Sequence, residues 1–156
     1  MKVEVRKTGK AESKKIYNIA KKLSPKWFDE VAINKTIPND LKNHPSLIAL
    51  TDGEVAGFVN YKINDKVAEI NWMGVDPNHF REGVGSKLLN KLVKTLKSDE
   101  VSRIKVETLD KKEGYKPYNR TRGFYISQGF KKIEEKKEYS EAAEEELILA
   151  IFSKGI

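Results

Sequence analysis

Apolar and polar positions alternate at the start of the chain and again in its middle third. Val3 and Val5 stand between charged neighbours, which predicts a short first strand. Tight-turn signals such as Asp52-Gly53 separate segments that are rich in β-branched residues. We expect these segments to form three strands of an antiparallel meander, at residues 47–51, 54–63 and 67–75.

Other segments show the spacing of an amphipathic helix. Apolar residues recur three and four positions apart over 12–23 and again over 83–97. Pro117 suits the first turn of a third helix, and Gly129 suits its C-terminal cap. The other segments are expected to be a loop with a short helix at 24–45 and strands at 101–109, 130–139 and 146–152.

The composition is that of a soluble globular protein. The chain has 156 residues, of which 38% are hydrophobic and 34% charged, so we expect a single domain over residues 1–156. Its longest apolar run, Leu147–Phe152, is too short for a membrane span, and its N-terminus lacks a secretory pattern, which favours a cytoplasmic protein. The absence of cysteine excludes disulfides and thiolate chemistry, and two histidines argue against a metal centre.

The net charge of +7 attracts polyanions, which include both nucleic acid and a phosphorylated cofactor. Lysines and glutamates are interspersed over residues 131–146, as on a solvated surface. Residues 111–122 gather basic and aromatic side chains, so a small basic domain that binds nucleic acid stays open as a less favoured alternative.

The segment from Val75 to Leu89 carries the clearest chemical signal. A strand ends, a short loop follows, and Gly83-Val84-Gly85 opens a helix with no Ser, Thr, Asp or Asn immediately before it as a cap. The first backbone N–H groups of this helix therefore need another partner, and a helix N-terminus with glycines suits an anion such as a pyrophosphate. A glycine pair that only makes a tight turn would look the same.

Two other phosphate loops fit this segment less well. A P-loop requires Gly-Lys-Ser/Thr, which the segment lacks. A dinucleotide fingerprint requires a third glycine or alanine where this chain has Leu88, and the preceding strand belongs to a meander rather than to a βαβ unit.

The order of motifs resembles the GNAT superfamily of acetyltransferases. Residues 80–85 match its acetyl-CoA loop at Gly83 and Gly85, with Phe80 where Gln or Arg is usual. Residues 124–130 (FYISQGF) resemble the second signature of the family, and residues 68–75 resemble the strand before the loop. The resemblance implies an α+β fold: a mostly antiparallel, twisted sheet of about six to seven strands, splayed at the cofactor cleft, with about four helices over both faces.

The resemblance also implies an N-acetyltransferase that moves an acetyl group directly from acetyl-CoA, as co-substrate, to a primary amine. Tyr125 would act as general acid towards the CoA thiolate, and Glu69 as base towards the amine, directly or through water, with Glu107 and Asn71 as alternatives. Gly74 would mark a bulge that splays its strand. The residues expected to contact the cofactor are Met73, Gly74, Val75, Arg81, Glu82, Gly83, Val84, Gly85, Ser86 and Tyr118.

The sequence leaves the acceptor amine open: a small molecule, a protein N-terminus or a lysine would each fit the chemistry. A non-catalytic module that binds acetyl-CoA is the main alternative to an enzyme. Homodimers are common in this fold, so the resemblance makes a homodimer possible for this protein.

Overall fold

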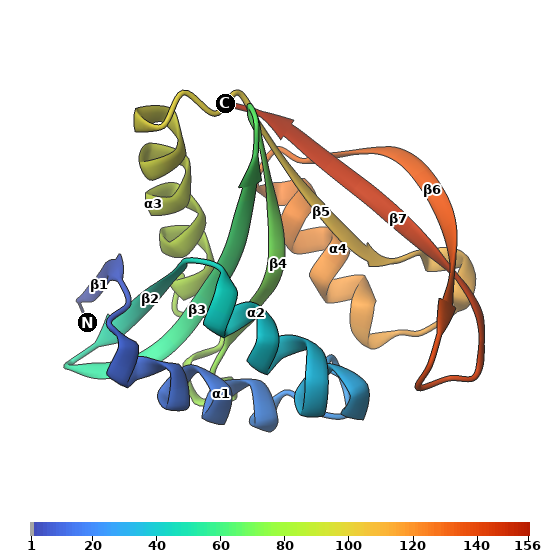
Figure 1. The fold of residues 1–156 in the computed structure, drawn as a ribbon, viewed down its shortest axis with the longest axis horizontal. Helices are drawn as coiled ribbons and strands as arrows, with labels where there is room; N and C mark the ends of the chain where they lie inside the picture. Colours follow the sequence, from blue (N-terminus) through green and yellow to red (C-terminus); the bar gives the residue numbers. More distant parts are fainter. Residues whose placement is uncertain (1) are drawn as a thin grey trace.

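A computed structural model describes residues 2–156 (Figure 1). Seven strands form one sheet in the order β1-β2-β3-β4-β5-β7-β6. Neighbouring strands are antiparallel except β4 and β5, which are parallel. The strands are β1 (Val3–Lys7), β2 (Ser46–Thr51), β3 (Glu54–Asn64), β4 (Val67–Val75), β5 (Arg103–Leu109), β6 (Lys131–Ser140) and β7 (Glu145–Gly155).

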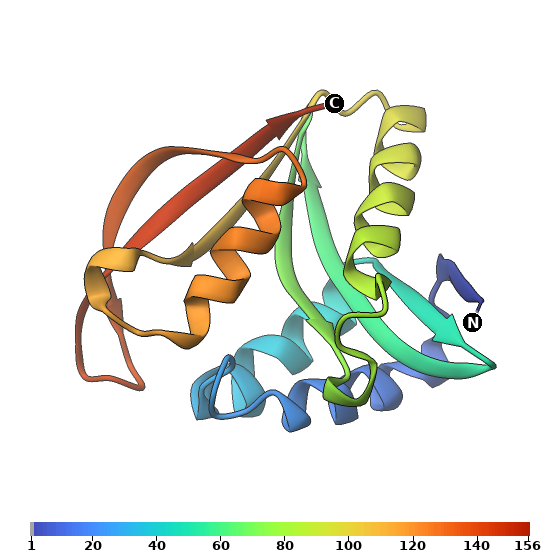
Figure 2. The ribbon, with the colours of Figure 1, turned by 180° about the vertical axis from the view of Figure 1, so that it is seen from behind.

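Helices cover both faces of the sheet, with α1 and α2 on one face and α3 and α4 on the other (Figures 1 and 2). They are α1 (Ser13–Lys22), α2 (Ile37–Asn43), α3 (Val84–Ser98) and α4 (Pro117–Ser127). The α+β fold and the order of its elements, as predicted from the sequence, are confirmed. The predicted short helix within 24–45 is α2, and a π-helical turn, η2 (Ala32–Thr36), leads into it. None of the helices in the described part of the chain has the length and apolar character needed to span a membrane.

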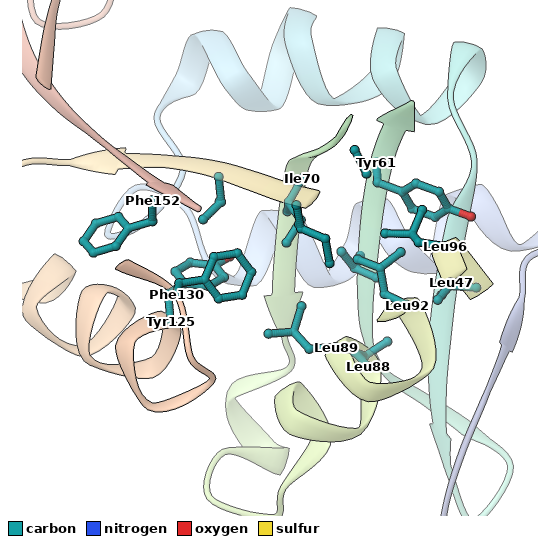
Figure 3. Close-up of a cluster of buried hydrophobic side chains, with 14 of the residues drawn as sticks. Leu47, Tyr61, Ile70, Leu88, Leu89, Leu92, Leu96, Tyr125, Phe130 and Phe152 are labelled. Atoms are coloured by element: carbon teal, nitrogen blue, oxygen red, sulfur yellow. The ribbon is translucent and has the colours of Figure 1, made fainter. Parts of the chain in front are cut away.

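The larger core fills the space between the sheet, α3 and α4 (Figure 3). The apolar face of α3 supplies Leu88, Leu92 and Leu96, each with no exposed surface. Burying one such side chain contributes about 1.5–3 kcal/mol relative to leaving it exposed. Tyr125 and Phe130 lie at the α4 end of the same cluster, so this core anchors both helices that follow the predicted motifs.

The second core lies on the opposite face, under α1 and α2. Ile16 and Ile19 of α1 pack with Phe58 of β3, which has no exposed surface. Trp27 and Phe28, in the segment after α1, extend this cluster towards the end of β4. The N-terminal helices are therefore tied to the central strands and not only to each other.

The parallel pairing of β4 and β5 covers only four residue pairs, from Val67 with Arg103 to Ile70 with Val106. Beyond Ile70 the two strands diverge (Figures 1 and 2). The structure therefore contains the splay that the fold class predicted, because the sheet continues past this point only through its antiparallel pairs on either side.

The bulge beside this splay lies at Asn71, and not at Gly74, so the prediction for Gly74 is wrong. Asn60 is opposite Trp72, whereas Tyr61 is opposite Ile70, which leaves Asn71 as the extra residue. The physical reason is a buried amide: Asn60 has no exposed surface, and its Oδ1 accepts a hydrogen bond of 2.9 Å from Nδ2 of Asn71. A buried carbonyl oxygen without such a donor would be costly.

β6 is the edge strand beside β7 and is exposed along nearly its whole length. Its partner β7 runs to Gly155, three residues beyond the predicted end, because it pairs with β5 as far as Arg103. The tip of the β6–β7 hairpin, residues 141–144, reaches across to η2, where Nζ of Lys35 lies 3.5 Å from Oε1 of Glu141.

Candidate active site

A cavity of about 350 Å³ lies between the end of β4, the start of α3 and α4. We call it the glycine-loop pocket. Four segments line it: the end of α1 and the following loop, the last residues of β4, the loop into α3, and one side of α4. The lining residues are Leu23, Trp27, Phe28, Met73, Gly74, Val75, His79, Phe80, Arg81, Gly83, Val84, Gly85, Ser86, Tyr118, Arg120, Thr121, Phe124 and Tyr125.

The loop between β4 and α3 is held by its own side chains. Asp76 accepts a hydrogen bond from the N–H of Asn78 and an ion pair of 2.8 Å from Nζ of Lys22. Burial alone would raise the pKa of Asp76, but Lys22 and the Asn78 amide together hold it below its usual range. Because Lys22 belongs to α1, this pair fixes the loop to the helix on the far face of the sheet.

Glu82 is the one predicted cofactor contact that does not line this pocket in the described part of the chain. Its Oε2 lies 2.6 Å from Nδ1 of His79, within the same loop. The carboxylate of Glu82 therefore stabilises the conformation of the loop. His79 itself does line the pocket.

The two predicted glycines have different structural roles. Gly83 has a φ of +79°, a left-handed conformation that other residues adopt with strain, and it is the N-cap of α3. At Gly85, an added Cβ would lie 3.0 Å from Cζ of Phe124, so this position must be small for α3 to meet α4. The tight-turn explanation therefore holds for Gly83, whereas Gly85 lies within α3 and is needed for the contact between α3 and α4.

The start of α3 nonetheless remains open to a ligand. Gly83 offers no side-chain cap, and within residues 2–156 we find no hydrogen bond to the N–H groups of Val84, Gly85 or Ser86. These amides belong to residues that line the glycine-loop pocket. Unpartnered N–H groups and the helix dipole together favour an anion at this point.

Tyr125 lies at the inner end of the pocket, where α4 faces β4. Its side chain packs edge-on against Phe124 and Phe130, and the residue is 5% exposed. Its hydroxyl donates a weak hydrogen bond to the thioether of Met73, with 3.8 Å between oxygen and sulfur. Burial raises the pKa of Tyr125 well above its ordinary value, so this phenol stays protonated and remains a hydrogen-bond donor.

Sequence reasoning missed Arg120, which enters the same pocket from the first turn of α4. Its guanidinium lies 4.4 Å from the centre of the Phe80 ring, and Phe80 packs edge-on against Trp27 at 5.8 Å. A signal was available, since Phe80 stands where the GNAT pattern usually has Gln or Arg. The structure brings a cation to this position from another helix.

A wall formed by the segment after α1 and the start of α4 closes one side of the pocket. The hydroxyls of Tyr115 and Tyr118 donate hydrogen bonds of 2.6 Å to the carbonyls of Lys26 and Trp27. The indole of Trp27 donates in return to the carbonyl of Pro117. Burial raises the pKa of Tyr118 to about 12. The predicted cofactor residue Tyr118 thus lines the pocket with its hydroxyl already engaged.

A second and larger cavity, of about 820 Å³, lies on the other side of this wall. We call it the acidic groove. Trp27, Phe28 and Tyr118 line both cavities, so the two are neighbours. The groove is bounded by the segment after α1, by β4 and β5 beyond their last pair, and by the β6–β7 hairpin. Its carboxylates are those of Asp29, Asp40, Glu69, Glu107, Glu138 and Glu141.

The structure places the three candidate bases around this groove. Glu69 has a side chain that is 34% exposed, with Nζ of Lys62 at 3.9 Å from Oε2. Glu107 is engaged more closely, by Nζ of Lys136 at 2.8 Å. Asn71 donates to Asn60, as described above. Glu69 therefore holds the loosest contact of the three, and it lies in the groove, whereas Tyr125 lies in the pocket.

Comparisons with known proteins agree with this architecture. The family model described as the acetyltransferase (GNAT) family matches residues 13–130, and the chain belongs to this family. A search among curated proteins gave no match.

Solved structures with the same fold include three that cover nearly the whole chain. A ribosomal-protein-S18-alanine N-acetyltransferase from Escherichia coli is 18% identical, with a TM-score of 0.78, over 99% of this chain and 94% of that one. A probable acetyltransferase from Staphylococcus epidermidis is 14% identical, with a TM-score of 0.82, over 99% of both chains. The PaiA N-acetyltransferase from Thermoplasma acidophilum, in complex with coenzyme A, is 18% identical, with a TM-score of 0.76, over 100% of both chains.

Proposed function

We propose that the protein is an N-acetyltransferase that binds acetyl-CoA in the glycine-loop pocket and transfers its acetyl group directly to an amine held in the acidic groove. One observation carries the proposal: the open amides of Val84, Gly85 and Ser86 share a pocket with the buried hydroxyl of Tyr125. An anion site and a hydrogen-bond donor in one cavity suit a phosphorylated thioester. Membership of the acetyltransferase family supports this assignment, and so does the coenzyme A complex of the Thermoplasma acidophilum protein.

The pocket offers a separate partner for each part of acetyl-CoA. The open amides at the start of α3 suit the pyrophosphate, with Arg81 and Arg120 as nearby cations. Met73, Gly74 and Val75 lie on the part of β4 that has lost its β5 partner, so their backbone groups can pair with the amides of the pantetheine arm. This orientation directs the thioester towards Tyr125.

The reaction requires a neutral amine and a stabilised leaving group. The nitrogen lone pair attacks the thioester carbonyl carbon, a C–N bond forms, and the C–S bond breaks to release the CoA thiolate. The proton lost by the amine goes to Glu69, directly or through water, because this carboxylate lines the groove from which the amine approaches. The products are an acetamide and free CoA.

Tyr125 acts on the sulfur. Its hydroxyl already donates to a sulfur atom, the thioether of Met73, and the thioester sulfur is a stronger acceptor once negative charge develops on it. A phenol ordinarily has a higher pKa than a thiol, and burial raises the pKa of Tyr125 further, so complete proton transfer to a free thiolate would be uphill. Tyr125 therefore stabilises the departing sulfur by a hydrogen bond, and the final proton comes from solvent.

A matched pair of α3 variants tests the cofactor site. In Ser86→Glu, a carboxylate faces the open amides, where it favours the helix dipole but repels phosphate. We expect the Kd for acetyl-CoA, measured by titration calorimetry, to rise at least about tenfold, since like charges in contact cost several kcal/mol. Asn90→Glu makes the same charge change one turn further along α3, at an exposed position, and should bind acetyl-CoA like the parent.

Two results would count against the proposal. Equal acetyl-CoA affinity in Ser86→Glu and Asn90→Glu would mean that the phosphate groups do not bind at the start of α3. Tight acetyl-CoA binding by the parent without release of CoA thiol, across a panel of amines, would identify a non-catalytic acetyl-CoA-binding module instead.

A further inference from the structure

We propose that the acceptor is a linear polyamine, in which several ammonium groups are joined by short methylene chains. This inference rests on the proposed function and names the substrate class of the same site. It starts from charge. The protein carries a net charge of +7, yet the lining of the acidic groove contains six carboxylates and one lysine, Lys26. A cavity of opposite sign to its protein selects a cation.

The groove already binds alkylammonium groups, namely lysine side chains that reach it from outside its lining. Nζ of Lys136 lies 2.8 Å from Glu107 and 4.0 Å from Glu138. Nζ of Lys35 lies 3.5 Å from Glu141. These lysine side chains are 39% and 70% exposed, and exposed ion pairs are weak, so the ammonium groups of a ligand can replace them at little cost.

The hydrogen-bonding groups of the groove favour a polyamine over a peptide as the ligand. The lining side chains that could donate are largely engaged within the protein: Trp72 donates to Asp40, Asn71 to Asn60, and Tyr115 and Tyr118 to backbone carbonyls. Asp40 and Asp29 already accept hydrogen bonds, from Trp72 and from the Ala32 amide, and the other carboxylates leave the lining with more acceptors than donors. A polyamine supplies only N–H donors, whereas the backbone carbonyls of a peptide would need donors and lose water without replacement.

Apolar surface lies between these polar groups. Trp72, Tyr139, Leu147 and Leu149 line the groove together with the carboxylates. Methylene spacers can pack on these side chains, and aromatic faces attract ammonium groups. The reacting nitrogen must lose its proton, while the other nitrogens stay charged and hold the chain in place.

The test compares spermidine, a triamine, with n-butylamine, which has one ammonium group, and with neutral and lysine-containing peptides that have free N-termini. CoA thiol release is followed at saturating acetyl-CoA. We expect kcat/KM for spermidine to exceed that for n-butylamine by about 10–100-fold, through contacts with the additional ammonium groups. The KM for spermidine should rise with salt concentration, because charge contacts are screened.

A double variant, Glu138→Gln with Glu141→Gln, locates the effect in the groove. We expect the KM for spermidine to rise about three- to tenfold, since each lost surface charge contact is worth little by itself. The KM for n-butylamine should rise by a smaller factor than the KM for spermidine, because one ammonium group makes fewer of these contacts. Glu134→Gln removes the same charge from β6 outside the lining of the groove and should change neither constant.

The possible failures are distinguishable. A higher kcat/KM for either peptide than for spermidine, or equal values for spermidine and n-butylamine, would overturn the polyamine inference and leave acetyl transfer intact. If no amine is acetylated, the proposed function fails, and calorimetric titration of the CoA-saturated protein with spermidine still decides whether the groove binds a polyamine. Absence of binding there would overturn the inference as well.

Discussion

The glycine-loop pocket and the acidic groove share a wall at Trp27, Phe28 and Tyr118, yet they present opposite kinds of group to a ligand. The pocket presents backbone N–H groups at the start of α3, together with a buried phenol. The groove presents carboxylates on partly exposed side chains from several elements. Backbone groups persist when side chains are exchanged, so acceptor preference can change in the groove without altering the cofactor site.

The largest expected effect comes from the pocket side of the wall. Tyr125→Phe keeps the ring and its packing and removes a hydroxyl whose partner within the described residues is the thioether of Met73. The fold and the affinity for acetyl-CoA should therefore survive. We expect kcat at saturating acetyl-CoA to fall about 10–1000-fold, near the usual contribution of one hydrogen-bond donor to a developing negative charge.

The acceptor panel sharpens this prediction. If Tyr125 acts on the sulfur, kcat should fall by a similar factor with every amine. A loss of kcat with only one acceptor would mean that Tyr125 acts on the acceptor and not on the sulfur. A parental kcat in a correctly folded variant would mean that Tyr125 contributes only to the packing of the core.

Glu69→Gln probes the groove side, and its effect should depend on pH. With the base removed, only the fraction of amine that is already neutral can react, and this fraction rises about tenfold per pH unit below the pKa of the amine. We expect kcat/KM to fall about 10–100-fold at pH 7, at or below the low end for one general base, and to recover as the pH rises. The full pH profile is the measurement.

The affinity for acetyl-CoA serves as the internal control for Glu69→Gln, because the residue lines the groove and is not among those lining the pocket in the described chain. Glu134→Gln is the charge-matched control. An unchanged pH profile would assign the base role elsewhere, with Glu107 as the next candidate.

The smallest expected effect concerns Arg120. Arg120→Gln removes the cation stacked on Phe80, and we expect the KM for acetyl-CoA to rise about three- to tenfold, since exposed charge contacts are weak. The value of kcat at saturating acetyl-CoA should not change. Lys111→Gln, an exposed charge change outside the pocket lining, is the control. An unchanged KM would mean that Arg120 only packs on Phe80.

The fold and most of the pocket could be predicted from the sequence because their signals are local. Apolar periodicity located the helices and strands, and the glycine pair located the start of α3. The contact between the Glu82 carboxylate and His79, three residues earlier, was not predicted, and within the described residues Glu82 does not line the pocket. The bulge was misplaced because it depends on the buried side chain of Asn60, eleven positions from Asn71 and on another strand.

The acidic groove left no comparable signal in the sequence. Its carboxylates come from segments as distant as Asp29 and Glu141, and each one alone looks like an ordinary surface charge. Arg120 left only an indirect signal, the unusual Phe80, because its guanidinium meets that ring only when α4 lies beside the loop. Long-range packing creates both features, and no short window of sequence contains it.

The exposed edge strand β6 also has a consequence for self-association. An unpaired sheet edge invites strand addition by a second chain, and lysines along it oppose this because each would lose water on pairing. β6 is lined with lysines and glutamates over almost all of its length. We therefore expect the sheet to end at β6 even at high protein concentration, so that any homodimer must form through another surface.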